Sequence, residues 1–163
     1  MAREIPINDQ FRDGFYEALA RVIVEFGRFE YLVKLCVKDL SEKGFDAGLL
    51  EAQSITKFRR LCNRALDIAN EKLNADEYSE FDRIMEEASS LAIYRNDSVH
   101  ACWTTENGTQ LRVRPVKKDD VVDWTRSRSV DVTELRAKAE EIRQLFLELN
   151  HKRLQWSVRV NAD

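Results

Sequence analysis

The sequence predicts a mostly α-helical protein: a bundle of four main helices with a small β-hairpin inserted before the last helix. Charged residues make up 34% of the 163 residues, with only 5 glycines and 2 prolines, a composition that favours helices and few irregular loops. Apolar residues recur at helical spacing in four long segments, and the period changes to two after residue 100. Because the chain has no linker or repeat, we expect residues 1–163 to form a single domain.

The first helix is expected from about Asp9 to Ser41, with Asn8 or Asp9 as its cap and Lys43-Gly44 as its stop. Its apolar face widens through residues 29–37, which is typical of a helix packed on more than one side, and we interpret it as core plus dimer interface. The segment 45–53 is either a loop or an extra turn. The apolar positions of this helix are Phe11, Phe15, Leu19, Val22, Ile23, Phe26, Phe29, Leu32, Val33, Cys36 and Leu40.

The next two helices are expected from about Ser54 to Leu73 and from residue 75 to about Asn96. Asn74, with Glu77 three residues later, is typical of a capping box. Arginine occupies a position of the third helix where the apolar pattern calls for a core residue, and arginine is rarely buried without partners. The stripe consists of Tyr78, Phe81, Met85, Ala88, Ala92, Arg95 and Val99.

A β-hairpin is predicted next, because residues 101–106 and 109–114 flank Asn107-Gly108, which favours a type I′ turn. The expected register places Trp103 opposite Arg112 as a cross-strand cation–π pair. Pro115 ends the second strand. Residues 121–126 fit a third strand or a short helix, and we favour the strand. A second capping-box pattern, in residues 131–134, opens a last helix to about residue 156.

Composition excludes several classes of function. The net charge of −3 means that nucleic-acid binding requires a local basic patch. Three widely spaced cysteines predict reduced thiols in a cytoplasmic protein. The chain has no apolar signal core and no run long enough to span a membrane, so we expect no membrane partner. The sequence lacks phosphate-binding glycine patterns and metal-ligand spacing (His100, Cys102 and His151 included), so we expect no cofactor and no metal.

The candidate catalytic residues are Arg95, Asn96 and His100. Histidine can take a proton from an RNA 2′-hydroxyl or give one to the leaving oxygen. Arginine can neutralise charge on the phosphoryl group, and the asparagine can orient either. RNA supplies its own nucleophile, so this chemistry requires no metal or serine.

A structural interpretation of the same residues stays open, because an Arg-x4-His pattern is short enough to arise by chance. Arg95 would pair with Glu30 or a helix C-terminal carbonyl, and His100 would be a cap. On a continuous helix, side chains five positions apart point roughly 140° apart. Arg95 and His100 therefore converge only if the helix ends between them or if they meet copies from a second subunit.

Candidate RNA-binding residues follow the motif. Cations could hold RNA phosphates and a tryptophan could stack on a base; the alternative is a hairpin with ordinary solvated charge. The candidates are Trp103, Arg112, Arg114, Lys117 and Lys118.

The segment Arg95-Asn96-Asp97-Ser98-Val99-His100, followed by Trp103, resembles the motif of the HEPN superfamily (higher eukaryotes and prokaryotes nucleotide-binding domain). The acidic residue within the apolar run Phe29-Glu30-Tyr31-Leu32 also resembles this superfamily. The resemblance covers about residues 10–155, although the motif alone is specific. It implies a helical bundle that dimerises with both motifs facing one cleft.

The resemblance also implies a function. Many members are metal-independent endoribonucleases that leave 2′,3′-cyclic phosphate and 5′-hydroxyl ends, in toxin–antitoxin, phage-defence or RNA-processing systems. Arg95, Asn96 and His100 would be catalytic, and an antitoxin or other regulatory protein would be a partner. Other members have lost catalysis and serve as RNA-binding or interaction modules, so both functions are expectations here.

Overall fold

The structure, a computed structural model, describes residues 10–41, 43–118 and 121–160. Residues 157–160 are described by their backbone alone. Its described part is mostly α-helical, as the composition predicts. The helices are α1 (Phe15–Leu40), α2 (Phe45–Ser54), α3 (Phe58–Lys72), α4 (Ala75–Val99) and α5 (Val132–Val160). The strands are β1 (Cys102–Glu106), β2 (Thr109–Val113), β3 (Val116–Lys118), β4 (Val121–Asp123) and β5 (Arg128–Ser129).

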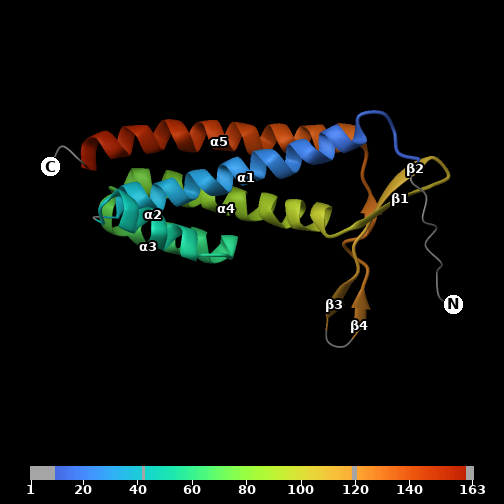
Figure 1. Cartoon of the computed structure of the whole chain (residues 1–163), viewed down its shortest axis with the longest axis horizontal. Helices are drawn as coiled ribbons and strands as arrows, with labels where there is room; N and C mark the ends of the chain where they lie inside the picture. Colours follow the sequence, from blue (N-terminus) through green and yellow to red (C-terminus); the bar gives the residue numbers. More distant parts are fainter. Residues whose placement is uncertain (1–9, 42, 119–120, 161–163) are drawn as a thin grey trace.

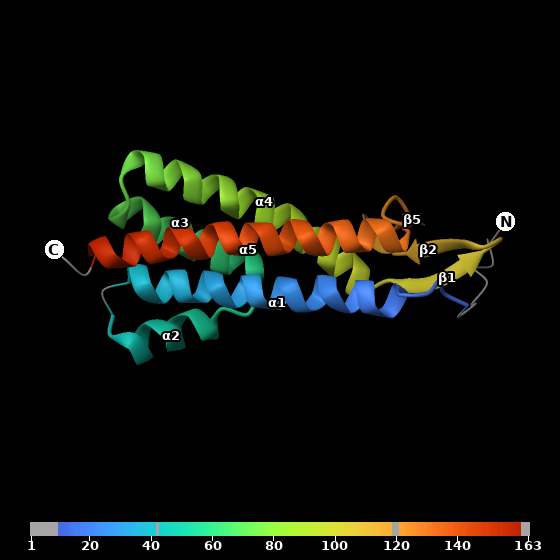
Figure 2. The same ribbon diagram turned by 90° about the horizontal axis from the view of Figure 1, so that it is seen from above.

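Four long helices form the body of the molecule. α1 and α5 lie side by side along most of their length, and α3 and α4 cover the other side of α1 (Figures 1 and 2). Burial of a large apolar side chain contributes about 1.5–3 kcal/mol, so these contacts dominate the stability of the bundle. The largest fully buried side chains are Phe15, Phe26, Phe29, Leu61, Phe81, Ile84, Met85, Leu135, Ile142 and Leu149.

The first helix begins later than the sequence predicts. Gly14 has a φ of 78°, a left-handed conformation that glycine adopts without the usual steric cost, and α1 starts at the next residue. A Cβ atom at Gly14 would also lie 2.6 Å from Nη2 of Arg136. The expected start at Asp9 is therefore wrong; Asn8 and Asp9 themselves lie outside the described residues.

A short fifth helix replaces the ambiguous segment 45–53. α2 follows Gly44 and packs against α1, burying Gly48 and Ala52. A Cβ atom at Gly48 would lie 3.3 Å from the Cα atom of Lys38, so glycine permits the close approach of the two helices. Because α2 takes residues up to Ser54, α3 starts four residues later than expected.

Both predicted N-terminal caps are present. The Asn74 side chain accepts a hydrogen bond from the Glu77 backbone N–H at 3.0 Å, and the Glu77 carboxylate accepts one from the Asn74 N–H at 3.1 Å. At α5, the Asp131 carboxylate accepts from the Glu134 N–H at 2.7 Å. These bonds satisfy donors that have no partner within the helix. α4 and α5 each run a few residues past their expected ends.

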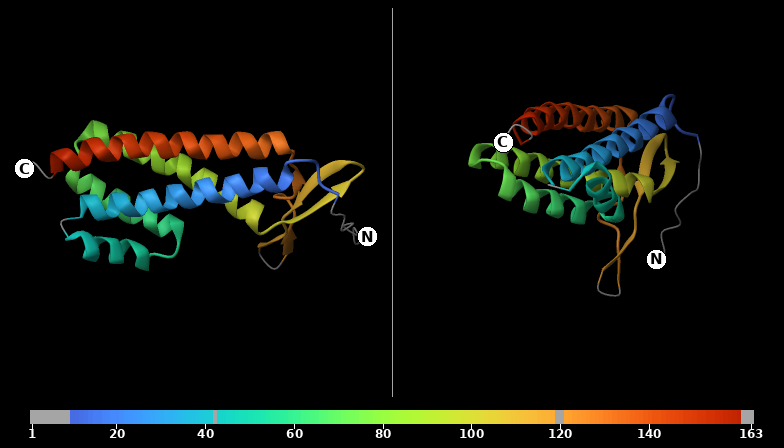
Figure 3. Two further views of the ribbon diagram at one scale, coloured as in Figure 1. Left: turned by 45° about the horizontal axis from the view of Figure 1, so that its top comes forward. Right: turned by 60° about the vertical axis from the view of Figure 1, so that its left-hand side comes forward.

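The predicted hairpin is also present. Asn107 and Gly108 have φ values of 50° and 74°, as a type I′ turn requires, and Trp103 lies opposite Arg112. β5 pairs with β2 as an unexpected third strand. The strand predicted at residues 121–126 is shorter and pairs with β3. This two-stranded ribbon, β3–β4, projects away from the helices (Figures 1 and 3).

Candidate functional site

The three candidate catalytic residues lie at the C-terminal end of α4. Arg95 and Asn96 are in its last turns, and His100 is the capping residue, whose backbone N–H donates to the Asn96 carbonyl at 3.0 Å. The helix ends at Val99, immediately before His100, and this bond continues the helical hydrogen-bond pattern to His100. Within one chain, their side chains leave α4 roughly 140° apart.

Arg95 is half-buried against an aromatic cluster. Its guanidinium carbon lies 5.6 Å from the ring centroid of Phe26, and that ring packs edge-on against Phe58 at 4.9 Å. The Arg95 Nε atom is buried without a hydrogen-bond partner. Glu30, a partner considered from the sequence, pairs with Lys34 at 3.4 Å. Among the described residues, no carboxylate forms an ion pair with Arg95.

Asn96 connects the arginine to the exposed side of the helix end. Nη1 of Arg95 donates a hydrogen bond to Oδ1 of Asn96 at 2.9 Å. Asn96 and His100, four positions apart, share a helical face, and both are exposed. The exposed face at the end of α4 therefore carries an amide and an imidazole, and the half-buried guanidinium of Arg95 is hydrogen-bonded to the amide.

The apolar stripe predicted that Arg95 and Val99 face inward, but the buried residues of the motif are Asp97 and Ser98. Asp97 is 5% exposed and Ser98 1%, whereas Val99 is 40% exposed. Oδ1 of Asp97 accepts a hydrogen bond from Nη1 of Arg126 at 3.0 Å and lies 3.7 Å from Nε of Arg114. Asp97 therefore ties α4 to the base of the β3–β4 ribbon, through the segment before β3 and the segment after β4. This role was not predicted from the sequence; the one signal for it was an acidic residue within the motif and the separate arginines, Arg114 and Arg126, later in the chain.

Arg112 lies in the core rather than on the RNA-binding surface suggested by the sequence. It is 4% exposed, its guanidinium lies 5.0 Å from the Tyr94 ring centroid, and Nη1 is 3.5 Å from Oγ of Ser98. The predicted cation–π pair with Trp103 is therefore wrong, because the cation lies over Tyr94. Burial lowers the pKa of Arg112, and the nearby Arg128 lowers it further.

Trp103 is likewise engaged in packing. Its indole N–H donates to the Ser98 carbonyl at 2.8 Å, and its ring packs edge-on against Phe15 at 5.1 Å. Stacking on a base would require the indole to give up these contacts. Trp124, at the base of the ribbon, is 49% exposed and is better placed for such a role.

The remaining RNA-binding candidates lie on or beside the ribbon. Lys117 and Lys118 are exposed on β3, and Arg114 is half-buried near Asp97. Arg126 adds a half-exposed guanidinium at the ribbon base. These cations lie next to the end of α4, together with the carboxylates of Asp97 and Asp123.

The described residues include no group of three or more histidine, cysteine or acidic side chains arranged to hold a metal ion. None of the helices in the described part of the chain is both long and apolar enough to cross a membrane. Cys36 and Cys62 are free and buried, and burial raises the pKa of each thiol to about 12. These two cysteines therefore remain protonated at neutral pH.

Comparisons of the chain with models of known families, with curated proteins and with solved structures find no match. The resemblance to the HEPN superfamily therefore depends on Arg95, Asn96, His100 and the helical setting in which they lie.

Proposed function

We propose that the protein is a metal-independent endoribonuclease that acts as a homodimer and leaves 2′,3′-cyclic phosphate and 5′-hydroxyl ends. The observation that carries the proposal is the hydrogen bond of 2.9 Å from Arg95 to Asn96. This bond links a cation to the exposed helix face that Asn96 shares with His100. A cation that neutralises phosphoryl charge and an imidazole that transfers protons are the groups that cleavage of RNA by its own 2′-hydroxyl requires.

The proposed reaction uses these groups as follows. Neutral His100 takes the proton of the 2′-hydroxyl, and the 2′-oxygen attacks the adjacent phosphorus. The bond between phosphorus and the 5′-oxygen breaks, and a protonated imidazole gives its proton to that oxygen. Arg95 stabilises the negative charge on the non-bridging oxygens, while Asn96 orients the guanidinium. No metal is needed in this scheme, because the nucleophile belongs to the RNA.

A second copy completes the site in this proposal. The side chains of Arg95 and His100 diverge on α4, so the His100 of a second copy would face the Arg95 of the first. Phe58, the first residue of α3, contacts the same Phe26 ring as Arg95. α3 does not extend to the C-terminal end of α4, so none of the described helices covers that end of α4 from the side of α3 (Figure 1). Val99 is 40% exposed there and offers apolar contact. Pairing would also exclude water from the two motifs, which strengthens electrostatic interactions in the cleft.

The exposed cations of the ribbon support RNA as the substrate. Lys117, Lys118 and Arg126 lie on or beside a ribbon that is anchored to the motif helix through Asp97. Phosphate contacts of this type would position the strand without reading its sequence. A toxin or phage-defence role in the cytoplasm, controlled by an antitoxin or another regulatory protein, belongs to the same proposal.

The second candidate function is a non-catalytic HEPN-like module that dimerises, binds a partner or binds RNA. The buried Nε atom of Arg95 and its contact with Phe26 favour this alternative. In that case Arg95→Ala lowers stability or dimerisation, and the protein has no ribonuclease activity to lose.

The test compares RNA cleavage in EDTA by the wild type, His100→Ala and His151→Ala. His151 is the matched control, because it is the other histidine of the chain and is exposed on α5. We expect His100→Ala to cleave on the order of 10²–10⁴-fold more slowly, with wild-type rates for the control and cyclic phosphate ends on the products. Light scattering and thermal unfolding check that each variant keeps its oligomeric state and its fold.

Equal cleavage by His100→Ala and the wild type would refute the assignment of the catalytic residue. A dimeric wild type that cleaves none of several structured and unstructured RNAs would instead favour the interaction module. A monomeric wild type at micromolar concentration would contradict both dimer proposals.

A further inference from the structure

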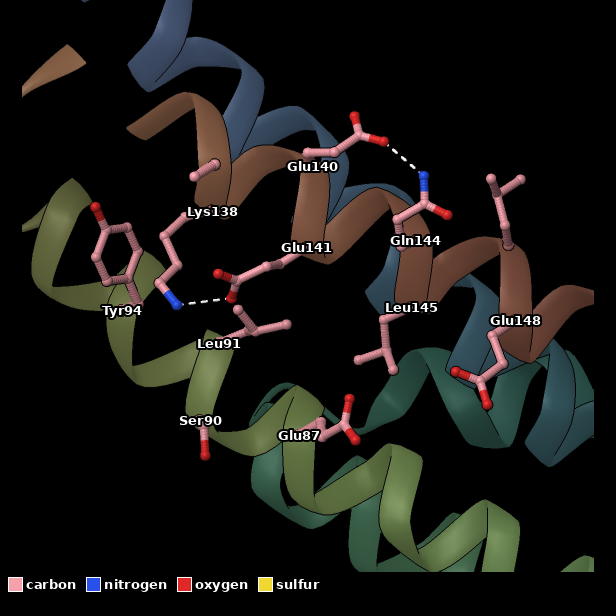
Figure 4. Close-up of a pocket in the computed structure, with 12 residues that line it drawn as sticks. Glu87, Ser90, Leu91, Tyr94, Lys138, Glu140, Glu141, Gln144, Leu145 and Glu148 are labelled. Atoms are coloured by element: carbon pink, nitrogen blue, oxygen red, sulfur yellow. Dashed lines mark hydrogen bonds and ion pairs between the residues drawn. The ribbon is translucent and has the colours of Figure 1, made fainter. Parts of the chain in front are cut away.

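A groove of about 1120 Å³ lies between α4 and α5. Its lining residues run from Glu87 to Tyr94 on α4 and from Ala137 to Glu148 on α5 (Figure 4). Eleven positions along α5 correspond to about 17 Å, or three helical turns, at about 1.5 Å per residue. The groove is therefore long enough to receive one short helix lying between two existing helices.

The groove combines leucines with acidic side chains. Leu91 and Leu145 are 8% and 4% exposed, and Leu147 is 45% exposed. Among the described lining residues, Lys138 is the one cation. Carboxylates come from both helices: Glu87 from α4, and Glu140, Glu141 and Glu148 from α5 (Figure 4).

Internal partners neutralise these carboxylates incompletely. Arg83 is shared between Glu87, at 2.6 Å, and Glu148. Lys138 pairs with Glu141 at 2.6 Å. Ion pairs that are this exposed contribute only about 0–1 kcal/mol each. Cations from a partner could therefore replace the internal ones with little loss of stability.

Glu140 receives a hydrogen bond from Nε2 of Gln144 at 2.5 Å and has Nη1 of Arg143 at 3.3 Å. One of these two partners is an uncharged amide, and Arg21 of α1 acts on the carboxylate through its charge without an ion pair. Even with Arg83, Arg143 and Lys138 counted, the four carboxylates exceed the three cations that pair with them.

We propose that this groove binds a basic amphipathic helix of a partner protein. In helix-in-groove recognition, an apolar stripe on the bound helix packs against an apolar floor; here Leu91 and Leu145 provide that floor. Lysine or arginine side chains flanking the stripe would reach the carboxylates of α4 on one side and α5 on the other. RNA phosphates would be repelled by the same carboxylates, so the groove and the proposed RNA surface select opposite charges.

The groove also adjoins the motif. Tyr94 lines it, and the next residue in the chain is Arg95, which leaves α4 about 100° further around the helix. A partner bound in the groove would contact the helix that carries the motif while leaving the motif surface open. The binding proposal does not depend on ribonuclease activity, because its readout is binding alone.

The test uses a fluorescein-labelled helical peptide of about 14 residues, long enough to fill the three turns of the groove, built from leucine and lysine in an amphipathic pattern. A peptide with glutamate in place of lysine is the probe control. The groove variant is Glu140→Lys with Glu141→Lys. The matched variant is Asp67→Lys with Glu71→Lys, which makes the same charge change at exposed positions of α3. Ser90→Trp, at an exposed lining position of α4, blocks the groove without changing charge.

We expect the groove variant and Ser90→Trp each to weaken binding of the lysine peptide by about tenfold or more. The α3 variant should change the Kd by less than about threefold, and the glutamate peptide should not bind. Thermal unfolding checks that each variant is folded. Equal weakening by the α3 and groove variants would show general charge attraction and overturn the proposal. Unchanged binding to Ser90→Trp, or no binding to the wild type, would also overturn it.

Discussion

Asp97→Asn should destabilise the protein and release the β3–β4 ribbon from α4. The Asp97 carboxylate is buried at 5% exposure, accepts a hydrogen bond from Arg126 at 3.0 Å and lies 3.7 Å from Arg114. Asparagine keeps the size of the side chain and one oxygen acceptor. The substitution therefore removes the negative charge without creating a cavity.

The expected loss lies between two limits. Breaking a fully buried ion pair costs about 3–5 kcal/mol, whereas an exposed pair contributes about 0–1 kcal/mol. The Arg126 and Arg114 side chains are 46% and 27% exposed, so water can hydrate the cations that lose their partner. We expect a loss of about 2 kcal/mol in the free energy of unfolding, which for a chain of this size lowers Tm by about 4–8 °C.

Urea denaturation measures this loss, with Asp67→Asn on the exposed face of α3 as the matched control, expected to change stability by less than about 0.5 kcal/mol. A double-mutant cycle with Arg126→Gln should give a coupling energy of about 1 kcal/mol. Proteolysis should cut the ribbon faster in Asp97→Asn than in the control. Equal stability of the two asparagine variants, or strict additivity with Arg126→Gln, would refute the role assigned to Asp97.

Two further predictions concern the same end of the bundle. Trp103→Phe keeps an aromatic ring but leaves the Ser98 carbonyl without its indole donor, so it should lower the free energy of unfolding by about 1–2 kcal/mol. The control, Trp124→Phe at an exposed position, should change the free energy of unfolding by less than about 0.5 kcal/mol. Equal effects of the two substitutions in urea denaturation would contradict the packing role of Trp103. Hydrogen bonding from Arg128 holds the pKa of Glu134 below its usual range, so this pair stabilises the fold above the unfolded pKa of about 4.3 and ceases to do so as pH falls through the folded pKa. The stability difference between the wild type and Glu134→Gln, followed by thermal unfolding, should therefore shrink toward acidic pH; a difference that is constant from pH 7 to pH 3 would be inconsistent with the ion pair.

Features that depend on neighbouring residues could be predicted from the sequence. The capping box of Asn74 and Glu77 and the turn at Asn107-Gly108 are determined within a few residues, and the structure contains both. α2 could not be assigned, because it buries only Gly48 and Ala52 and has little apolar periodicity. Its helical state is supported by packing against α1, which lies outside any local pattern.

The candidate site shows a different limit of sequence reasoning. The apolar stripe of α4 continues through Arg95 to Val99 in sequence, but Val99 is exposed and the stripe no longer marks the buried face. Helical periodicity identifies the buried face of a helix, but it does not show where along that helix the neighbouring helices end and cease to cover the face. Asp97 turns inward because arginines more than fifteen residues later meet it, and such a distant pairing leaves no periodic signal.

The contact between Arg95 and Phe26 is compatible with both the catalytic and the structural function. A cation–π contact contributes about 0.5–1 kcal/mol at a partly exposed site, and Nη1 of Arg95 donates to Asn96 while the guanidinium lies over Phe26. The donors at its edge are the groups that bind phosphate oxygens. A contact that holds the guanidinium in place would therefore stabilise the fold and also preorganise a catalytic cation. Loss of stability in Arg95→Ala is expected from both functions. His100 separates them, because it is exposed at the end of α4: under the proposed catalytic function, its substitution would change the rate of RNA cleavage without changing the packing of the bundle.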